Sequence, residues 1–232
     1  MRFLIYLIVF VLISSCSNQY NIAGNSNVSF FDGRMLYLKV AGEDAYAINV
    51  DSCQVIHGRF DFYGNVDSVV LAQLCMEDEK IMPVVLERGN LVVEVDHSGQ
   101  SVAGGPYNER LYKFLKKKNR IEHEQWELDQ KFLQLMQEGK SMDEIQKKLG
   151  EKSHKLSKEM EDLETKFILE NCDNPLGPGY FMMLFGQYPL PLMTEQLKNI
   201  INLAPSDFFN DPFVDKFIRK AKLREADSLK KK

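Results

Sequence analysis

The sequence lacks the short motifs that most catalytic and cofactor sites require. It contains no Cys-x-x-Cys pair, no glycine-rich phosphate loop and no serine in a nucleophile elbow. In the stretch His123-Glu124-Gln125-Trp126-Glu127, Glu127 stands where a zinc-protease motif needs its second imidazole. The pair Glu151-x-x-His154 has a di-iron spacing, but such a site needs two pairs and two further carboxylates. We therefore expect no metal, no cofactor and no catalytic residue, and we interpret both segments as solvent-facing helix.

A basic surface and a long hydrophobic run are also lacking. The chain has 29 Lys+Arg against 33 Asp+Glu, and no basic stretch with interleaved aromatic residues, which argues against nucleic acid as a partner. The apolar run Phe3–Ile13 has 11 residues. As a helix it would be about 16 Å long, roughly half the thickness of a bilayer core. It is too short for a transmembrane anchor.

The start of the chain has the layout of a signal peptide. Arg2 precedes the apolar run, and Ile13-Ser14-Ser15-Cys16 follows as a sequence that resembles a bacterial lipobox, in which the cysteine thiol takes a diacylglycerol. We expect lipid attachment at Cys16, with each acyl methylene contributing ~0.8 kcal/mol to membrane binding. Ser17 in place of Asp predicts the outer membrane, facing the periplasm. An ordinary signal peptide with an incidental cysteine is the alternative.

Charge and residue type divide the rest of the chain near Gly104-Gly105-Pro106. Residues 17–104 contain 5 basic and 12 acidic residues and are rich in Val and Phe. Residues 105–232 contain 23 basic and 21 acidic residues and are rich in Lys, Glu and Leu. We predict an α+β protein with an antiparallel β-sandwich-like domain followed by an α-helical domain. The predicted segments are a signal peptide (1–15), a lipidated tether (16–26), the β domain (27–105) and the helical domain (106–232).

The acidic part shows the alternation of strands with one buried face. Phe60 and Phe62 alternate with polar residues, and His57-Gly58 is placed to form a two-residue hairpin turn with positive φ at both positions. We place further turns at Gly64-Asn65 and Gly89-Asn90. The short spacing of the apolar runs favours a sandwich or barrel. The predicted strands cover residues 35–40, 45–50, 55–62, 66–76, 81–86 and 91–95.

The second part has helical periodicity. An apolar stripe runs from Tyr107 to Gly139, and Ser141-Met142-Asp143-Glu144 is a capping box that opens a second helix, so we predict a long antiparallel helical hairpin. The run Leu176–Tyr188 is either a packed helix or an adaptable docking face. Two more helices are predicted to begin at Thr194 and at Asp211-Pro212.

Three cysteines remain besides Cys16. In an oxidising compartment Cys53, Cys75 and Cys172 allow one disulfide and one free thiol. Cys53 and Cys75 lie in strand-like runs, where free cysteine often behaves as a small buried hydrophobe. We favour free thiols, and the pairing stays open at this point.

The string Asp51-Ser52-x-x-Val55-x-x-Gly58-Arg59-Phe60-x-Phe62-x-Gly64 resembles the domain of unknown function 4369 (DUF4369). Leu86–Asn90, Ser101-x-x-Gly104 and Asn108 extend the resemblance over roughly residues 20–110. His57 departs from it, because the family commonly has Asn there. These motifs are structural glycines and core aromatic residues, so they transfer no catalytic role. The resemblance implies a Bacteroidota-type lipoprotein, a group in which a thioredoxin-like domain often follows, but no Trp-Cys-x-x-Cys segment occurs here.

These observations predict a lipid-anchored envelope protein that acts as a non-enzymatic binding or interaction module. Its partner besides the membrane would be a protein, a peptide or a small envelope ligand. An accessory role in thiol–disulfide redox chemistry is the first alternative, and it depends on the resemblance to thioredoxin-family lipoproteins. An enzyme with a carboxylate site in a cleft between the two domains is the second.

Overall fold

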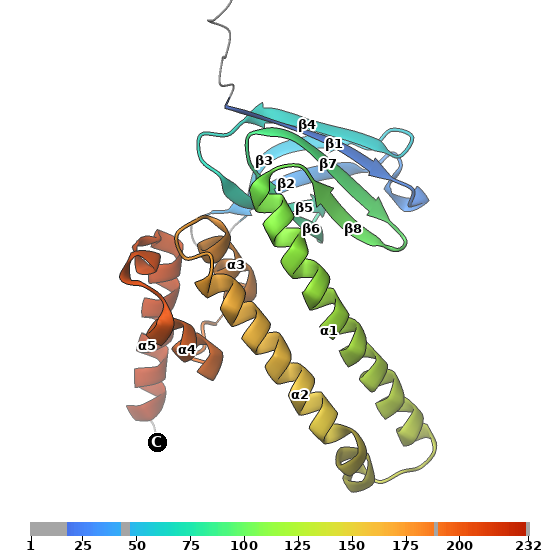
Figure 1. Ribbon diagram of the computed structural model, residues 1–232, viewed down its shortest axis with the longest axis vertical. Coiled ribbons are helices and arrows are strands. Elements are labelled where there is room, and N and C mark those ends of the chain that lie inside the picture. Colours follow the sequence, from blue (N-terminus) through green and yellow to red (C-terminus); the bar gives the residue numbers. More distant parts are fainter. Residues whose placement is uncertain (1–17, 43–46, 188–189, 231–232) are drawn as a thin grey trace, which may run out of the picture.

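The computed structural model describes residues 18–42, 47–187 and 190–230 (Figure 1). The predicted signal peptide and Cys16 lie outside the described residues. Eight strands form two sheets in the described part, with the orders β4-β1-β7-β8 and β3-β2-β5-β6. Within the sheets β1 pairs with β7 in parallel, and the other pairs are antiparallel. The strands are β1 Gln19–Ser26, β2 Met35–Ala41, β3 Ala47–Gln54, β4 Arg59–Asn65, β5 Val70–Met76, β6 Glu79–Leu86, β7 Gly89–Asp96 and β8 Gly99–Ala103.

The two sheets pack face to face around one hydrophobic core, which confirms the predicted sandwich. Inward-facing residues alternate with outward-facing ones along the strands, as in β1 and β4, where Tyr20, Ile22, Phe60 and Phe62 are all buried. The rings of Phe60 and Phe62 contact each other edge to face, with centroids 6.1 Å apart. The residues that alternate as apolar positions in the sequence are therefore the residues that face this core.

The predicted tether over residues 16–26 is wrong for its described part. Residues 19–26 form β1, which lies inside its sheet between β4 and β7. The physical reason is the burial of Tyr20 and Ile22, which belong to the shared core. The folded chain begins earlier still, because the Val66 amide donates to the Asn18 carbonyl oxygen at 2.7 Å.

One predicted turn is confirmed and two are wrong. His57 and Gly58 have φ of 51° and 73°, and Ile56 and Arg59 exchange backbone hydrogen bonds across them, as in a two-residue hairpin. Gly64 and Asn65 are instead the last two residues of β4, and Gly89 and Asn90 are the first two of β7. Gly64 is required by packing, because a Cβ atom there would lie 2.6 Å from the Tyr20 hydroxyl oxygen. A glycine in a strand can mark a site where another group packs closely against the backbone.

The helical region confirms the predicted hairpin and its caps. Ser141 and Glu144 form the capping box at the start of α2, and Thr194 caps α4. Asp211 accepts hydrogen bonds from the backbone amides of Phe213 and Val214 at the start of α5. Within the described part of the chain, no helix has both the length and the apolar character needed to cross a bilayer. The helices are α1 Pro106–Gln137, α2 Met142–Leu169, α3 Leu176–Phe185, α4 Glu195–Leu203 and α5 Pro212–Lys230.

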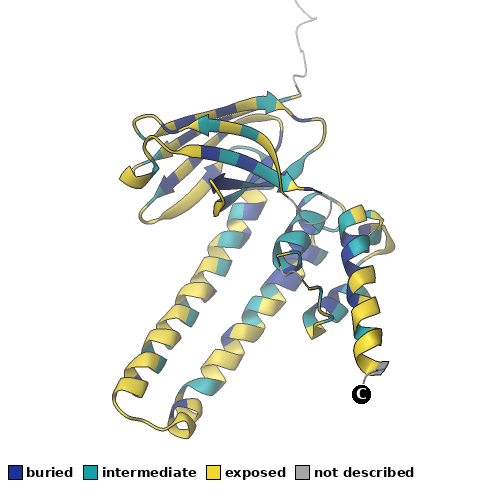
Figure 2. Ribbon diagram, turned by 180° about the vertical axis from the view of Figure 1, so that it is seen from behind, coloured by how far each residue is buried: buried dark blue, intermediate teal, exposed yellow. Residues whose placement is uncertain are grey.

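A second hydrophobic core joins the helices to the outer face of the β3-β2-β5-β6 sheet. Leu71 of β5 and Val85 of β6 pack with α1, α2 and α3 in one cluster. Within the run Leu176–Tyr188, residues 176–185 form α3, in which Phe181 is fully buried, so the packed-helix prediction is confirmed there. Figure 2 shows that the hairpin is exposed over most of its length beyond this core.

Polar groups also meet at the base of the hairpin. The buried carboxylate of Glu164 accepts hydrogen bonds from Lys118 Nζ at 2.9 Å and from the Tyr180 hydroxyl at 3.0 Å. The Tyr180 ring stands edge-on to the stacked rings of Phe114 and Phe167. Three helices are thus tied together by one ion pair and one aromatic cluster.

Candidate ligand-binding site

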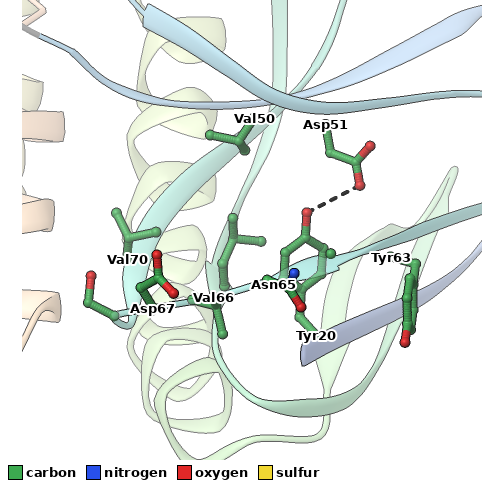
Figure 3. Close-up of a pocket in the computed structure, with 11 residues that line it drawn as sticks. Tyr20, Val50, Asp51, Tyr63, Asn65, Val66, Asp67 and Val70 are labelled. Carbon is green, nitrogen blue, oxygen red and sulfur yellow. Dashed lines mark hydrogen bonds between the residues drawn. The ribbon is translucent and has the colours of Figure 1, made fainter. Parts of the chain in front are cut away.

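A pocket opens between the two sheets at the end of the sandwich where β1 begins (Figure 3). Its volume is about 350 Å³. The lining residues come from β1, β3, β4, the start of β5, the end of β6 and the segment that joins β4 to β5. They are Tyr20, Val50, Asp51, Tyr63, Gly64, Asn65, Val66, Asp67, Ser68, Val70 and Leu86.

A hydrogen bond across the pocket connects the two sheets. The Tyr20 hydroxyl donates to Asp51 Oδ2 at 3.1 Å, and the Ser52 amide donates to Asp51 Oδ1 at 2.8 Å. Burial, followed by the charge of Asp51, raises the pKa of Tyr20 to about 12. The tyrosine is therefore a permanent hydrogen-bond donor at neutral pH, and it fixes the position of the Asp51 carboxylate.

Tyr63 presents an aromatic ring beside the pocket, on the outer face of β4, because Phe60 and Phe62 occupy the inward positions of this strand. Its side chain is 64% exposed, and its hydroxyl donates to Gln19 Oε1 at 2.5 Å, so the ring is held in place although it faces solvent. The lining contains two carboxylates, Asp51 and Asp67, and no lysine or arginine. Such a lining is suited to a ligand with hydrogen-bond donors or a positive group.

A buried junction to α1 fixes the strand that forms the back of the pocket. Glu87 directly follows Leu86, and its carboxylate accepts from the backbone amides of Tyr107 and Asn108 at 3.2 and 2.8 Å. It therefore caps a helix whose own N-cap residue, Gly105, has no side chain. A Cβ atom on Gly105 would lie 2.4 Å from the Glu87 carboxylate.

Asn108 completes the junction by pairing with the open edge of β6. Its side-chain amide accepts from the Val85 amide at 2.9 Å and donates to the Val85 carbonyl oxygen at 2.8 Å. A second donated hydrogen bond, of 2.9 Å, reaches Glu87 Oε1. Further along β6, the Tyr112 hydroxyl donates to the Pro83 carbonyl oxygen. The helix thus satisfies backbone groups that an edge strand would otherwise leave unpaired.

The two segments considered as metal-binding candidates, residues 123–127 and 151–154, are not among the residues that line the pocket. His123 Nε2 and Glu127 Oε1 are 3.4 Å apart on an exposed face of α1, and His154 is exposed on α2. Among the described residues, no group of three or more His, Cys, Asp or Glu side chains is arranged to hold a metal ion.

The three described cysteines are free thiols. Cys53 and Cys75 pair across β2 with Leu36 and Tyr37, which are consecutive and so point to opposite faces of the sheet. A disulfide between Cys53 and Cys75 is therefore excluded by geometry. Burial raises the pKa of Cys53 and of Cys172 to about 11, and it also raises the pKa of Cys75.

These shifts predict that alkaline pH destabilises the fold. The pKa values of Cys53 and Cys172 rise from 9.0 to about 11 on folding, and burial raises that of Tyr20 from 10.0 to about 12. The folded state holds these protons more tightly, so stability is complete below the unfolded pKa values and declines as pH rises through the folded ones. Thermal unfolding followed by circular dichroism should give a steady midpoint from pH 7 to about 8.5 and a falling one above about pH 9.

A double Cys53→Ala, Cys172→Ala variant is the control for that experiment. It should show a smaller fall between about pH 9 and 10, because only Cys75 and the buried tyrosines then contribute. An unfolding midpoint that is unchanged up to about pH 11 would contradict the assignment.

The comparison with known families agrees with the pattern of glycines and aromatic residues. Residues 20–111 match the family described as Domain of unknown function (DUF4369). These residues belong to the DUF4369 family. The match extends into the first turns of α1, so the DUF4369 unit includes both Glu87 and Asn108 and with them the whole junction. The search of curated proteins found no match to this chain.

Proposed function

We propose that the protein is a lipid-anchored, non-enzymatic binding module of the bacterial outer membrane, facing the periplasm, with the lipid on Cys16. The ligand, a protein, a peptide or a small envelope molecule, would bind at the pocket between the two sheets. The observation that carries the binding role is the pocket itself. It presents two carboxylates, Asp51 on β3 and Asp67 in the segment between β4 and β5, and the first of them is fixed by the Tyr20 hydroxyl.

Two features support this assignment of the site. The strands on either side of the pocket are held by the Tyr20–Asp51 hydrogen bond, and the strand behind it is held by the α1 junction. A preformed site loses little conformational entropy when a ligand binds. The pocket also lies at the end of the sandwich where β1 begins, next to the predicted anchor.

Site-specific photo-cross-linking in the native envelope tests the binding role. A photoreactive phenylalanine analogue at position 63 should give an adduct of discrete mass, and the added substitution Asp51→Ala should weaken it. The matched control places the same analogue at Ser98, which is exposed at the opposite end of the sandwich. Equal adducts from both positions, or none from position 63, would count against the pocket.

The redox alternative leads to a separate expectation: the protein should not catalyse thiol–disulfide exchange. Such catalysis needs a thiolate of lowered pKa and a resolving thiol nearby, whereas the pKa values of Cys53, Cys75 and Cys172 are all raised. An insulin-reduction assay with residues 17–232 and dithiothreitol should give the background rate. Turnover above background that is lost in a triple Cys→Ser variant would favour the redox role.

A further inference from the structure

The folded chain begins so close to Cys16 that the anchor fixes where the sandwich lies. The carbonyl oxygen of Asn18 already accepts the Val66 amide, so Ser17 is the one residue between the lipidated position and the fold. Two residue steps span at most about 7 Å. We infer that the end of the sandwich where β1 begins lies against the phospholipid surface that holds the anchor. This inference rests on the lipidation of Cys16 in the proposed function.

Strand register identifies the residues at this surface. Gln19 lies opposite Asn65 of β4, and Tyr20 lies opposite Gly64 of β4 and Gly89 of β7. The end of β4 and the start of β7 therefore lie beside the start of β1, together with the mouth of the pocket. These strand ends therefore lie within a few residue lengths of the acyl chains proposed on Cys16.

The side chains at this end suit the polar interface of a bilayer. Tyr63 exposes an aromatic ring with a hydroxyl group, a combination that is enriched where hydrocarbon meets water. Val50, on the other side of the pocket, is 44% exposed. The two pocket carboxylates, Asp51 and Asp67, disfavour anionic headgroups. The contact is therefore made by the anchor and the aromatic residue on a zwitterionic surface, whose phosphate groups are also within reach of Arg88, exposed directly before β7.

The helical hairpin lies on the other side of the molecule. The helices pack on the outer face of the β3-β2-β5-β6 sheet, whereas β1 belongs to the opposite sheet, and Figure 1 shows the hairpin extending away from the sandwich. Trp126, the single tryptophan of the chain, is 56% exposed and lies 20 residues beyond the start of α1. That is about 30 Å along the helix. Trp126 is a natural reporter for the part that should stay clear of lipid.

Tryptophan quenching by brominated lipid tests this orientation. The full lipidated protein is reconstituted into phosphatidylethanolamine–phosphatidylcholine vesicles whose acyl chains carry bromine near the headgroup. A Tyr63→Trp, Trp126→Phe variant should lose most of its fluorescence, whereas wild-type Trp126 should lose almost none. A flexible insert of about ten Gly and Ser residues after Ser17 adds roughly 17 Å of reach and should reduce the quenching at position 63.

Mass spectrometry of the N-terminal peptide separates the two ways of failing. If Cys16 carries no lipid, the proposed function fails and the orientation fails with it. If Cys16 is lipidated and the Tyr63→Trp variant is not quenched, or Trp126 is quenched equally, the orientation alone is overturned. Quenching at position 63 in a Cys16→Ala form of that variant, mixed with the same vesicles, would show that this end binds lipid without the anchor and would overturn the claim that the anchor fixes the orientation.

Discussion

Substituting Asn108→Ala is expected to lower the free energy of unfolding by about 3–5 kcal/mol. The side chain is fully buried and makes three hydrogen bonds, two to the Val85 backbone and one to Glu87. Alanine leaves the Val85 amide and carbonyl groups without these partners on the edge of β6. Each buried polar group left unsatisfied costs about 1–3 kcal/mol. The unfolding midpoint should fall by on the order of 10 °C.

Asn90→Ala is the matched control for this substitution. Its side chain makes one exposed hydrogen bond, accepted from Asn21 at 3.3 Å, so the change in stability should stay within about 0.5 kcal/mol. Asn108→Asp should be at least as harmful as Asn108→Ala, because it puts a second carboxylate beside the buried Glu87. Chemical unfolding of all three variants gives the comparison. A loss of less than about 1 kcal/mol for Asn108→Ala would mean that the junction does not hold α1 to the sandwich.

The parts of the fold that local pattern decides could be predicted from the sequence. The φ values at His57-Gly58 and the capping box at Ser141–Glu144 depend on neighbouring residues alone, and both are confirmed. The hairpin follows from an apolar stripe with a glycine, Gly139, at the turn. In each case the residues that decide the structure lie within a few positions of one another.

The parts that depend on distant contacts could not be predicted. The position of β1 directly after the predicted signal peptide favours a tether, although Tyr20 and Ile22 alternate with Asn21 and Ala23 in the period of a strand. The glycine at position 64 favours a turn when only its neighbours are considered. The residue that requires a glycine there is Tyr20, whose ring packs against position 64 from 44 residues away in sequence. Without β1 there is no pocket, so its residues could not be brought together from the sequence.

The junction between β6 and α1 also depends on contacts between residues that are distant in sequence. Glu87 and Asn108 are conspicuous in the sequence only through the family resemblance, which does not say what they do. The structure places one carboxylate on a helix N-terminus and one amide on a strand edge, across 21 residues of chain. Polar residues that satisfy the backbone of a distant element leave no local period, so periodicity does not find them.

The second large effect is expected from Cys16→Ala, which should release the protein from the membrane. A single residue, Ser17, separates Cys16 from the folded chain, and no described helix is able to cross a bilayer. The acyl chains on Cys16 would therefore supply the attachment, with each buried methylene contributing ~0.8 kcal/mol. Fractionation should move the variant from the membrane to the soluble periplasm, while its circular dichroism spectrum stays that of the wild-type domain.

Metabolic labelling with a fatty acid tests the central claim most directly. Cells that produce the full-length protein are grown with radiolabelled palmitate, and the protein is recovered from the membrane and soluble fractions. We predict label on the wild-type protein, recovery in the outer-membrane fraction, and loss of both in Cys16→Ala. A wild-type protein that is unlabelled and soluble in the periplasm would contradict the account.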